Sequence, residues 1–194
     1  MNETLLQAVR RGRIPVAVRA AAKREHMPLA TMLAGIKAGT IVVMQPHHDR
    51  AVPCAIGAGT RVKVNANLGT SGDRVSLPAE RAKLRAALAA GADAVMDLST
   101  GGNLRTIRRA LRRAAPVAFG SVPLYDAAVH AVRRTGGIIG LTGDDMLAAV
   151  RRHCEDGVDF VTVHCGLTLA AVGRLRSQGR VLNVVSRGGS FLTS

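Results

Sequence analysis

Five short polar turns, each directly after an apolar run, hold the residues of this 194-residue sequence that are best suited to bind a small polar molecule. In chain order the turns are NANLGTSG, MDLSTGGN, SVPLY, HCGLT and SRGGS. They contain amides, hydroxyls, an imidazole and a guanidinium, which are groups that bind sugars, phosphates and carboxylates. No acid–base pair stands out by its spacing. The turns therefore indicate a small, polar, anionic ligand without specifying a reaction.

The last turn is the strongest candidate for an anion site. Arg187 is followed by Gly188 and Gly189, and a guanidinium beside glycine backbone N–H groups suits a phosphate or a carboxylate. A second polar run forms either a similar anion nest or the N-cap of the next helix. It consists of Asp97, Ser99, Thr100, Gly101 and Gly102.

Four further residues lie in or beside the turns. Asn65 and Asn67 are two apart on one predicted strand, so both amides face the same side and bind either a ligand or local backbone. Tyr125 is the only tyrosine; a lone aromatic is usually a core residue, but this one lies among polar turns. His164 ends an apolar strand, where it serves either as a core histidine or as a group that contacts substrate or moves a proton.

The elements that must position these turns alternate from residue 61 onward. Short β-branched runs predict strands at 61–68, 93–99, 116–123, 160–166 and 181–187, and helical spacing of apolar residues predicts a helix in each gap. Gly91, Gly157 and Gly179 are placed as left-handed C-caps. Repeated βα units give an α/β fold with a parallel sheet, either doubly wound or a (β/α)8 barrel. Because the first turn lacks the GxGxxG spacing, we favour a partial barrel of about five βα units, which would bring all five turns to one face.

Residues 1–60 differ from the repeats and are expected to form a helical N-terminal arm and loop, followed by the partial barrel at 61–194. Helical patterns cover 5–12, 16–27 and 28–39, and an irregular stretch covers 41–59. His47 and His48 are adjacent in that stretch. Neighbouring side chains in extended backbone point opposite ways, so a shared metal ion is disfavoured and a surface or substrate-loop role is expected.

Composition excludes several classes of protein. The net charge of +14 suggests nucleic acid, but only 2% of the residues are aromatic and the arginines fall on the outer faces of predicted helices, so we expect no nucleic-acid partner. No apolar run reaches the ~18 residues of a membrane span. The N-terminus has charges where a secretory signal needs apolar residues, which favours a cytoplasmic location. Three separated cysteines, Cys54, Cys154 and Cys165, form no metal motif and are expected to be small core residues.

Together, the motifs VKVNANLG, GADAVMDLSTGGN, SVPLYDA, GVDFVTVHCG and VVSRGGS resemble those of the phosphomethylpyrimidine synthase family of thiamine biosynthesis, in the same order and at similar spacing. IKAGTIVVMQP and IGAGTRVKVNAN resemble that family's approach to its barrel. The resemblance therefore extends from about residue 25 to the end of the sequence. The anaerobic 5-hydroxybenzimidazole synthases share most of these motifs.

The resemblance implies a carbon–carbon lyase that rearranges 5-aminoimidazole ribotide to hydroxymethylpyrimidine phosphate by radical chemistry, with loss of carbon monoxide and formate. It also implies S-adenosylmethionine, a 4Fe–4S cluster and a further metal, often zinc. Carried over by motif, the positions that contact this substrate are Asn67, Met96, Tyr125, His164, Ser186, Arg187 and Gly188. A ribotide carries a phosphate, which agrees with the Arg-Gly-Gly turn.

The family continues past this turn through an Asp-Gly-Leu-Arg turn, a glutamate, two metal-binding histidines and a CxxCxxxxC that holds the cluster, and this sequence has none of them. We therefore expect a fragment that ends after the fifth barrel strand. Its open strand edges favour a homo-oligomer or a complementing chain. We expect the isolated chain to be unable to cleave S-adenosylmethionine, which a 5′-deoxyadenosine assay after iron–sulfur reconstitution tests.

Three other functions compete with this one. A 5-hydroxybenzimidazole synthase-like protein and a non-catalytic ribotide-binding remnant both fit the motifs. An unrelated aldolase barrel is disfavoured, because Lys63, the only strand lysine, lies early in its strand.

Overall fold

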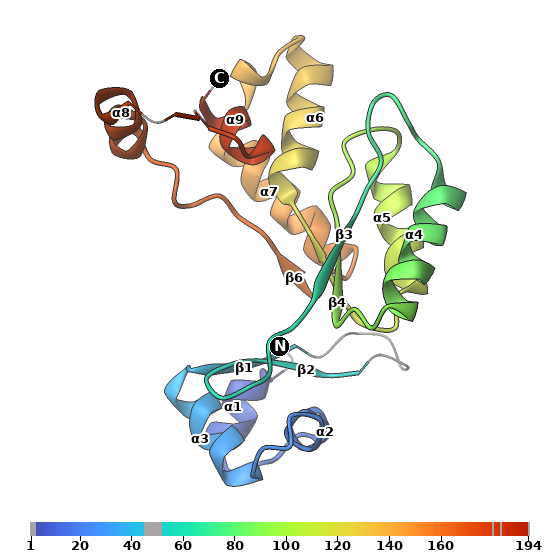
Figure 1. Cartoon of the computed structure of the whole chain (residues 1–194), viewed down its shortest axis with the longest axis vertical. Helices are drawn as coiled ribbons and strands as arrows, with labels where there is room; N and C mark the ends of the chain where they lie inside the picture. Colours follow the sequence, from blue (N-terminus) through green and yellow to red (C-terminus); the bar gives the residue numbers. More distant parts are fainter. Residues whose placement is uncertain (1–2, 45–51, 180, 183, 194) are drawn as a thin grey trace.

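The computed structural model describes residues 3–44, 52–179, 181–182 and 184–193 of the chain. Figure 1 shows a smaller lower body and a larger upper body that are joined by a narrow neck. The elements of the lower body are α1 (Leu5–Arg10), α2 (Val16–Arg24), α3 (Leu29–Ala38), β1 (Ile41–Met44) and β2 (Cys54–Gly57).

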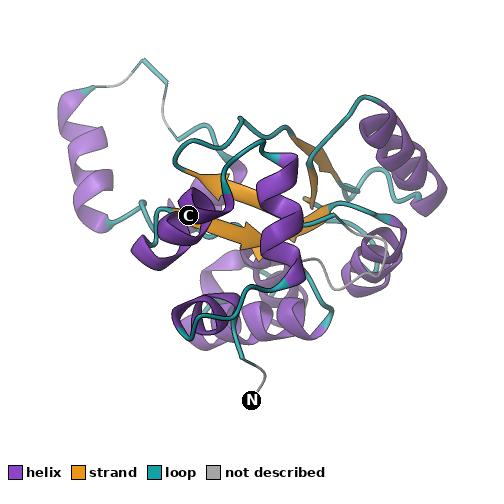
Figure 2. Ribbon diagram, turned by 90° about the horizontal axis from the view of Figure 1, so that it is seen from below, coloured by secondary structure: helices purple, strands orange, loops and turns teal. Residues whose placement is uncertain are grey.

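The upper body is built on a parallel sheet of four strands in the order β3-β4-β5-β6. The strands are β3 (Asn65–Leu68), β4 (Ala94–Asp97), β5 (Ala118–Ser121) and β6 (Phe160–Val161). The helices are α4 (Leu77–Ala89), α5 (Leu104–Ala114), α6 (Pro123–Thr135), α7 (Gly143–Glu155), α8 (Leu169–Gln178) and α9 (Arg187–Thr193), with a short 3₁₀ turn at Ile138–Gly140. This confirms the α/β class. The strands follow one another in chain order, as they do around a βα barrel, and Figure 2 shows them at the centre with helices outside.

Helix periodicity places the main core between the sheet and its helices. Leu104, Ile107 and Leu111 recur at helical spacing along α5 and are buried. Ile107 and Leu111 belong to one core cluster with Val95 of β4 and Phe119 of β5. Asn103 begins α5 by accepting a hydrogen bond from the Thr106 amide at 3.1 Å. No helix in the described part of the chain is long and apolar enough to span a membrane.

The predicted glycine caps are confirmed. Gly91, Gly157 and Gly179 have φ of +83°, +78° and +59°, the left-handed region in which glycine carries no Cβ penalty. Each glycine turns the chain out of a helix, and after Gly91 and Gly157 the chain enters the next strand of the sheet.

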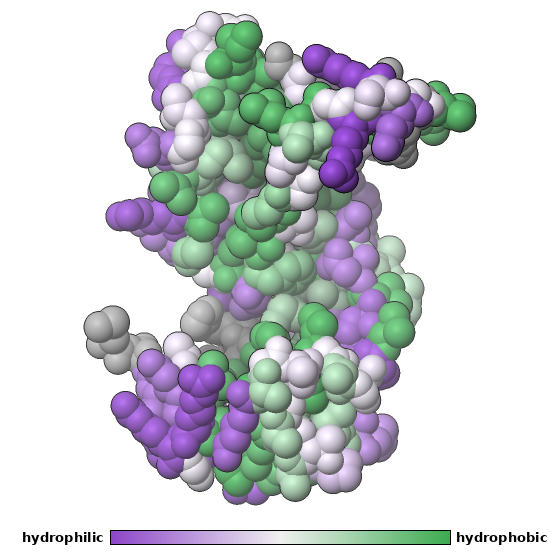
Figure 3. Space-filling view, turned by 90° about the vertical axis from the view of Figure 1, so that its left-hand side faces the viewer, coloured by the Kyte–Doolittle hydropathy of each residue, from purple (hydrophilic) through white to green (hydrophobic). Residues whose placement is uncertain are grey.

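The prediction of a fifth strand of the barrel at 181–187 is wrong. The described residues of 181–187 form no strand, and α9 begins at Arg187. The neighbouring strand β6 has only two residues, paired with Gly120 and Ser121, so it offers almost no ladder for another strand to join. Val181, Leu182 and Val185 are consequently exposed. α8 buries none of its residues, and apolar surface is visible on this side of the upper body in Figure 3.

The irregular stretch predicted at 41–59 is also wrong, because it contains β1 and β2, which pair antiparallel from Ile41 opposite Gly57 to Met44 opposite Cys54. With the three helices they enclose a separate small core that includes Val18, Met32 and Ala55. His47 and His48 lie outside the described residues. The division of the chain at residue 60 stays a prediction.

Residues 61–64 form the neck, and ion pairs join them to both bodies. Lys63 Nζ lies 2.9 Å from Glu25 Oε1 of the lower body, and Arg61 pairs with Asp93 at the start of β4. Burial alone would raise the pKa of Glu25, but the Lys63 hydrogen bond and the Arg61 amide outweigh it and lower the pKa. The Arg61 hydrogen bond lowers the pKa of Asp93. Residues 61–64 were predicted as strand, but they form this connection, and β3 starts only at Asn65.

Candidate functional site

Two of the predicted site residues are neighbours in the sheet. Asn67 of β3 and Met96 of β4 are direct partners in the parallel register. Thr162, just after β6, donates a hydrogen bond to Met96 Sδ at 3.1 Å. Asn65 donates through its side-chain amide to Asn67 Oδ1 at 3.1 Å. The two side chains therefore bind each other, and this contact fixes the orientation of both amides.

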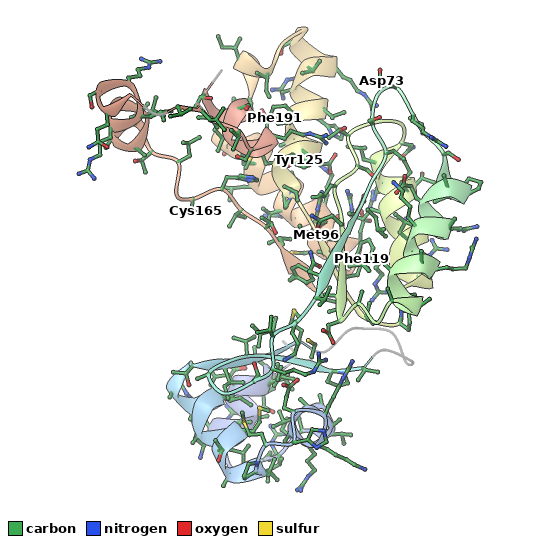
Figure 4. All side chains as sticks on the ribbon, viewed as in Figure 1. Asp73, Met96, Phe119, Tyr125, Cys165 and Phe191 are labelled. Atoms are coloured by element: carbon green, nitrogen blue, oxygen red, sulfur yellow. The ribbon has the colours of Figure 1, made fainter. Side chains whose placement is uncertain are left out.

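Tyr125, in the first turn of α6, is the centre of an aromatic and cationic cluster. Its ring lies 6.3 Å from the His164 ring and 5.8 Å from the ring of Phe191, which it meets edge-on. The Arg187 guanidinium carbon lies 5.6 Å from the Tyr125 ring centroid, within cation–π range. Figure 4 shows Tyr125 and Phe191 side by side, with Met96 further down the sheet. Three turns of the predicted set, SVPLY, HCGLT and SRGGS, therefore meet through α6 and α9.

Gly188 allows α9 to approach His164. A Cβ on Gly188 would lie 1.9 Å from His164 Nε2, so no side chain larger than hydrogen fits there. Ser186 accepts a hydrogen bond from the Gly189 amide at 3.0 Å and so starts the turn. The prediction that His164 ends a strand is wrong, because β6 ends at Val161 and His164 lies in the loop beyond it. Its Nδ1 is buried and has no hydrogen-bond partner among the described residues.

A cavity of about 410 Å³ opens beside this cluster. Three predicted residues line it, Asn67, Tyr125 and Arg187, and its volume lies within the roughly 300–1,000 Å³ of small-molecule sites. Met96 instead lines a separate cavity of about 660 Å³ between the sheet and the β1–β2 pair. The other lining residues of the smaller cavity are Leu68, Gly69, Thr70, Ser71, Lys83 and Leu98.

Sequence reasoning missed Glu80 and Lys83 of α4, which hold the Gly69 turn of this cavity. Glu80 Oε2 accepts from the Gly69 amide at 2.8 Å, and Lys83 Nζ donates to the Gly69 carbonyl at 3.2 Å. The two side chains pair at 2.6 Å. An i,i+3 Glu–Lys pair usually marks a solvated helix face, so no signal in the sequence distinguishes it.

The turn after β4 is hydrogen-bonded to Thr70, which lines the same cavity. Asp97 accepts hydrogen bonds from the amide and hydroxyl of Ser99, at 3.0 and 2.5 Å, and Ser99 Oγ accepts from the Thr70 amide at 3.1 Å. Burial raises the pKa of Asp97, although the Ser99 hydrogen bonds partly offset it. Asn103 caps α5, so of the two alternatives for this run the N-cap is wrong. Asp97 and Ser99 instead join two turns.

A buried polar network lies behind the turns and was not predicted. Ser121 Oγ lies 2.7 Å from His153 Nδ1, and His153 Nε2 lies 3.1 Å from Asp126 Oδ2. Ser121 and His153 are 1% and 2% exposed, so this serine and histidine cannot reach a substrate. Arg108 was expected on an outer helix face but is 2% exposed, because it pairs with Asp156 and Asp126.

The cysteines fit no cluster. Cys54 is buried, as expected, whereas Cys154 and Cys165 are exposed and the expectation of core residues is wrong for them. In the part of the chain that the structure describes, no group of three or more His, Cys, Asp or Glu side chains is placed to hold a metal ion. The described residues therefore provide no ligand set for an iron–sulfur cluster or zinc.

These features define a class. An α/β protein with a polar cavity at the carboxyl ends of parallel strands is built as βα enzymes are, with loops from successive repeats meeting where ligand binds. A more specific assignment comes from sequence: the chain belongs to the radical SAM ThiC family, whose model matches residues 4–194. The family name implies an iron–sulfur cluster and S-adenosylmethionine as the cofactors of its members.

Similar proteins carry two names. The chain is 47% identical over 191 residues to the phosphomethylpyrimidine synthase of Moorella thermoacetica, covering 98% of the chain and 44% of the relative. It is 47% identical over 189 residues to that of Syntrophus aciditrophicus, covering 97% and 44%. The 5-hydroxybenzimidazole synthase BzaB of Moorella thermoacetica is 44% identical over 185 residues, covering 95% and 43%. The chain thus spans less than half the length of these relatives.

Proposed function

We propose that this chain forms the ribotide-binding part of a phosphomethylpyrimidine synthase, which converts 5-aminoimidazole ribotide to hydroxymethylpyrimidine phosphate. The observation that carries the proposal is the convergence of Asn67, Tyr125 and Arg187 on one cavity beside His164. S-adenosylmethionine and an iron–sulfur cluster would supply the radical chemistry in the complete protein. The zinc implied by the motifs, and assembly with a further copy or chain, belong to the same proposal.

Each residue has a role that its chemistry supports. Arg187, stacked on Tyr125, presents fixed N–H donors to the phosphate of the ribotide. The Asn67 amide, oriented by Asn65, hydrogen-bonds the polar ribose or imidazole groups. His164 Nδ1 is buried without a hydrogen-bond partner among the described residues, so it is free to accept or donate one proton beside the substrate. Ser186 and Gly188 set the turn that brings Arg187 to this position.

Binding of 5-aminoimidazole ribotide to the chain tests the proposal by isothermal titration calorimetry. We expect saturable binding that weakens about tenfold in Arg187→Gln, the scale of one charge-assisted hydrogen bond. Arg176→Gln, on the solvated helix α8, is the matched control and should bind as the unchanged chain does. Equal affinity of the Arg187 variant and the control would exclude the proposed phosphate contact.

A second candidate is the binding site of a 5-hydroxybenzimidazole synthase, because the BzaB relative matches 95% of the chain at 44% identity. Both candidates predict the ribotide site. Product analysis of a complete protein that carries this sequence distinguishes them, since one product is a pyrimidine phosphate and the other a benzimidazole.

A further inference from the structure

A second polar cavity, of about 470 Å³, lies between α5, α6 and α7 and shares no lining residue with the proposed ribotide cavity. The helices that form it can be followed in Figure 1. Its lining residues are Gly102, Asn103, Leu104, Arg105, Arg108, Asp126, His130, Arg133 and Arg152. It takes no part in the function proposed above.

The lining has an excess of positive charge. The three helices contribute four arginines to it: Arg105, Arg108, Arg133 and Arg152. Two carboxylates oppose them. Asp126 lines the cavity, but its Oδ2 is occupied by His153 at 3.1 Å and lies 3.6 Å from both Arg108 and Arg152. Asp156 binds Arg105 and Arg108 from behind. Four guanidinium groups against two carboxylates leave a net charge of about +2 with neutral histidines.

Donors remain unused in this lining. Arg152 Nε is buried and has no hydrogen-bond partner among the described residues. Arg133 donates through one nitrogen to the Gly102 carbonyl at 3.0 Å, which holds its guanidinium over the start of α5. A guanidinium has five N–H donors. Among the described residues, the Gly102 carbonyl accepts a hydrogen bond from Arg133 and no group accepts one from Arg152 Nε, so donors remain for a ligand.

The backbone adds to the same charge. Leu104 and Arg105 are the first two residues of α5, an 11-residue helix, and their N–H groups have no partner within the helix. The positive end of the helix dipole therefore points toward the region that Arg133 covers. Arginines from three directions and a helix start suit the tetrahedral oxygens of a phosphate better than the planar oxygens of a carboxylate.

We propose that this cavity is a second anion site, which binds the phosphate group of free phosphate or of a small phosphate ester. Its volume lies within the roughly 300–1,000 Å³ of small-molecule sites, so it accommodates a phosphate with an organic substituent. Arg105 and Arg133 are the exposed arginines of the lining and contact the ligand from two helices, α5 and α6. Arg108 and Arg152 form the inner wall.

Titration of the chain with inorganic phosphate at constant ionic strength, followed by the amide NMR signals of Gly102, Asn103 and Leu104, tests the proposal. We expect saturable shifts, and affinity about tenfold lower in Arg105→Gln and in Arg133→Gln, the scale of one charge-assisted hydrogen bond. Both side chains are exposed, and Asp156 keeps its two hydrogen bonds from Arg108 when Arg105 is replaced, so both variants should fold. Arg109→Gln is the matched control, because Arg109 is an exposed arginine of α5 that does not line the cavity.

The remaining arms separate this site from others. Arg187→Gln should leave these shifts unchanged, which distinguishes failure here from failure of the proposed ribotide site. A parallel titration with adenosine 5′-monophosphate shows which source of phosphate is favoured. The proposal is overturned if no saturable shift appears, if the shifts appear only at Gly69–Ser71, or if Arg109→Gln weakens binding as much as Arg105→Gln.

Discussion

Arg108 and Asp156 form a buried ion pair that joins α5 to the end of α7. Asp156 Oδ2 accepts from Arg108 Nη2 at 2.7 Å and from Nε at 3.1 Å, and the two side chains are 2% and 1% exposed. Arg105 occupies the other carboxylate oxygen at 2.8 Å. A carboxylate this enclosed is stabilised only by its partners, so the pair holds the helices in register while both members are present.

Replacing Asp156 by Asn should therefore destabilise the chain. The change leaves Arg108 with only the more distant Asp126, at 3.6 Å, and we expect the free energy of unfolding to fall by about 3 kcal/mol, as when one partner of a buried pair is lost. Asp144→Asn, in the exposed first turn of the same helix α7, is the control and should cost less than about 1 kcal/mol. Urea denaturation measures both. Equal losses would show that the Arg108–Asp156 pair contributes nothing specific.

Asp126 should make the free energy of unfolding decrease at acidic pH. Burial alone would raise the pKa of Asp126, but the His153 hydrogen bond and the charges of Arg108, His153 and Arg152 outweigh it and lower the pKa from 3.8 to about 2. A lowered pKa in the folded state gives stability that is present above the ordinary value and is lost as the pH falls toward about 2. The difference in unfolding free energy between the unchanged chain and Asp126→Asn should shrink between pH 5 and pH 2. A difference that stays constant over this range would contradict the assignment.

Local patterns in the sequence predicted most of the helices and the strands β3 to β6, because most of these elements bury one regular face. Leu104, Ile107 and Leu111 of α5 are an example, and all three are buried. The stretch 181–187 shows where such patterns fail. Its β-branched residues favour a strand, but a strand forms only where a neighbouring ladder exists, and β6 ends after two residues.

The candidate site was predicted in part for the same reason. The pairing of Asn67 with Met96 follows from the parallel register of repeated βα units, whereas their choice as site residues came from the family motifs. The stacking of Arg187 and Phe191 on Tyr125 depends on α9, a helix that the sequence pattern did not indicate. Arg108 and Lys83 are charged residues at helical spacing. The sequence pattern is the same whether such a side chain is solvated or pairs with a buried carboxylate. Only the packing of other helices decides between the two.

Gly188→Ala should release α9 from the site. The new Cβ would lie 1.9 Å from His164 Nε2, so either the helix or the imidazole must move. Tyr125 is the only tyrosine and the chain has no tryptophan, so its fluorescence reports directly on the contacts with Arg187 and Phe191. We expect acrylamide to quench Tyr125 more strongly in this variant.

Gly173→Ala is the matched control for this substitution. Gly173 lies within α8, and nothing lies within 4 Å of a Cβ built there. Alanine is favoured over glycine inside helices by about 1 kcal/mol, so this variant should be as stable as the unchanged chain or more stable. Unaltered quenching in Gly188→Ala would show that α9 does not depend on the close approach to His164.

Glu80→Ala should disturb the wall of the proposed ribotide cavity. The variant removes the acceptor of the Gly69 amide and the partner of Lys83, and Glu80 is 4% exposed. An unsatisfied buried amide costs about 1–3 kcal/mol, so we expect a loss of that size in unfolding free energy and weaker binding of the ribotide. Arg81→Ala, at the neighbouring exposed position, should change neither. Glu80→Gln keeps the hydrogen-bond acceptor but loses the charge. Its affinity for the ribotide should lie between that of Glu80→Ala and that of the unchanged chain.

The three cysteines should react in two groups. Cys54 is buried on β2, and burial raises the pKa of its thiol, so little reactive thiolate forms near neutral pH. Cys154 and Cys165 are exposed and should be alkylated by iodoacetamide at rates near those of small thiols. Mass spectrometry of the folded chain at pH 8 should show two modified cysteines, and the chain unfolded in guanidinium chloride should show all three. Modification of Cys54 as fast as Cys165 in the folded chain would mean that the cavity between the β1–β2 pair and the upper sheet, which Cys54 lines, opens to the reagent.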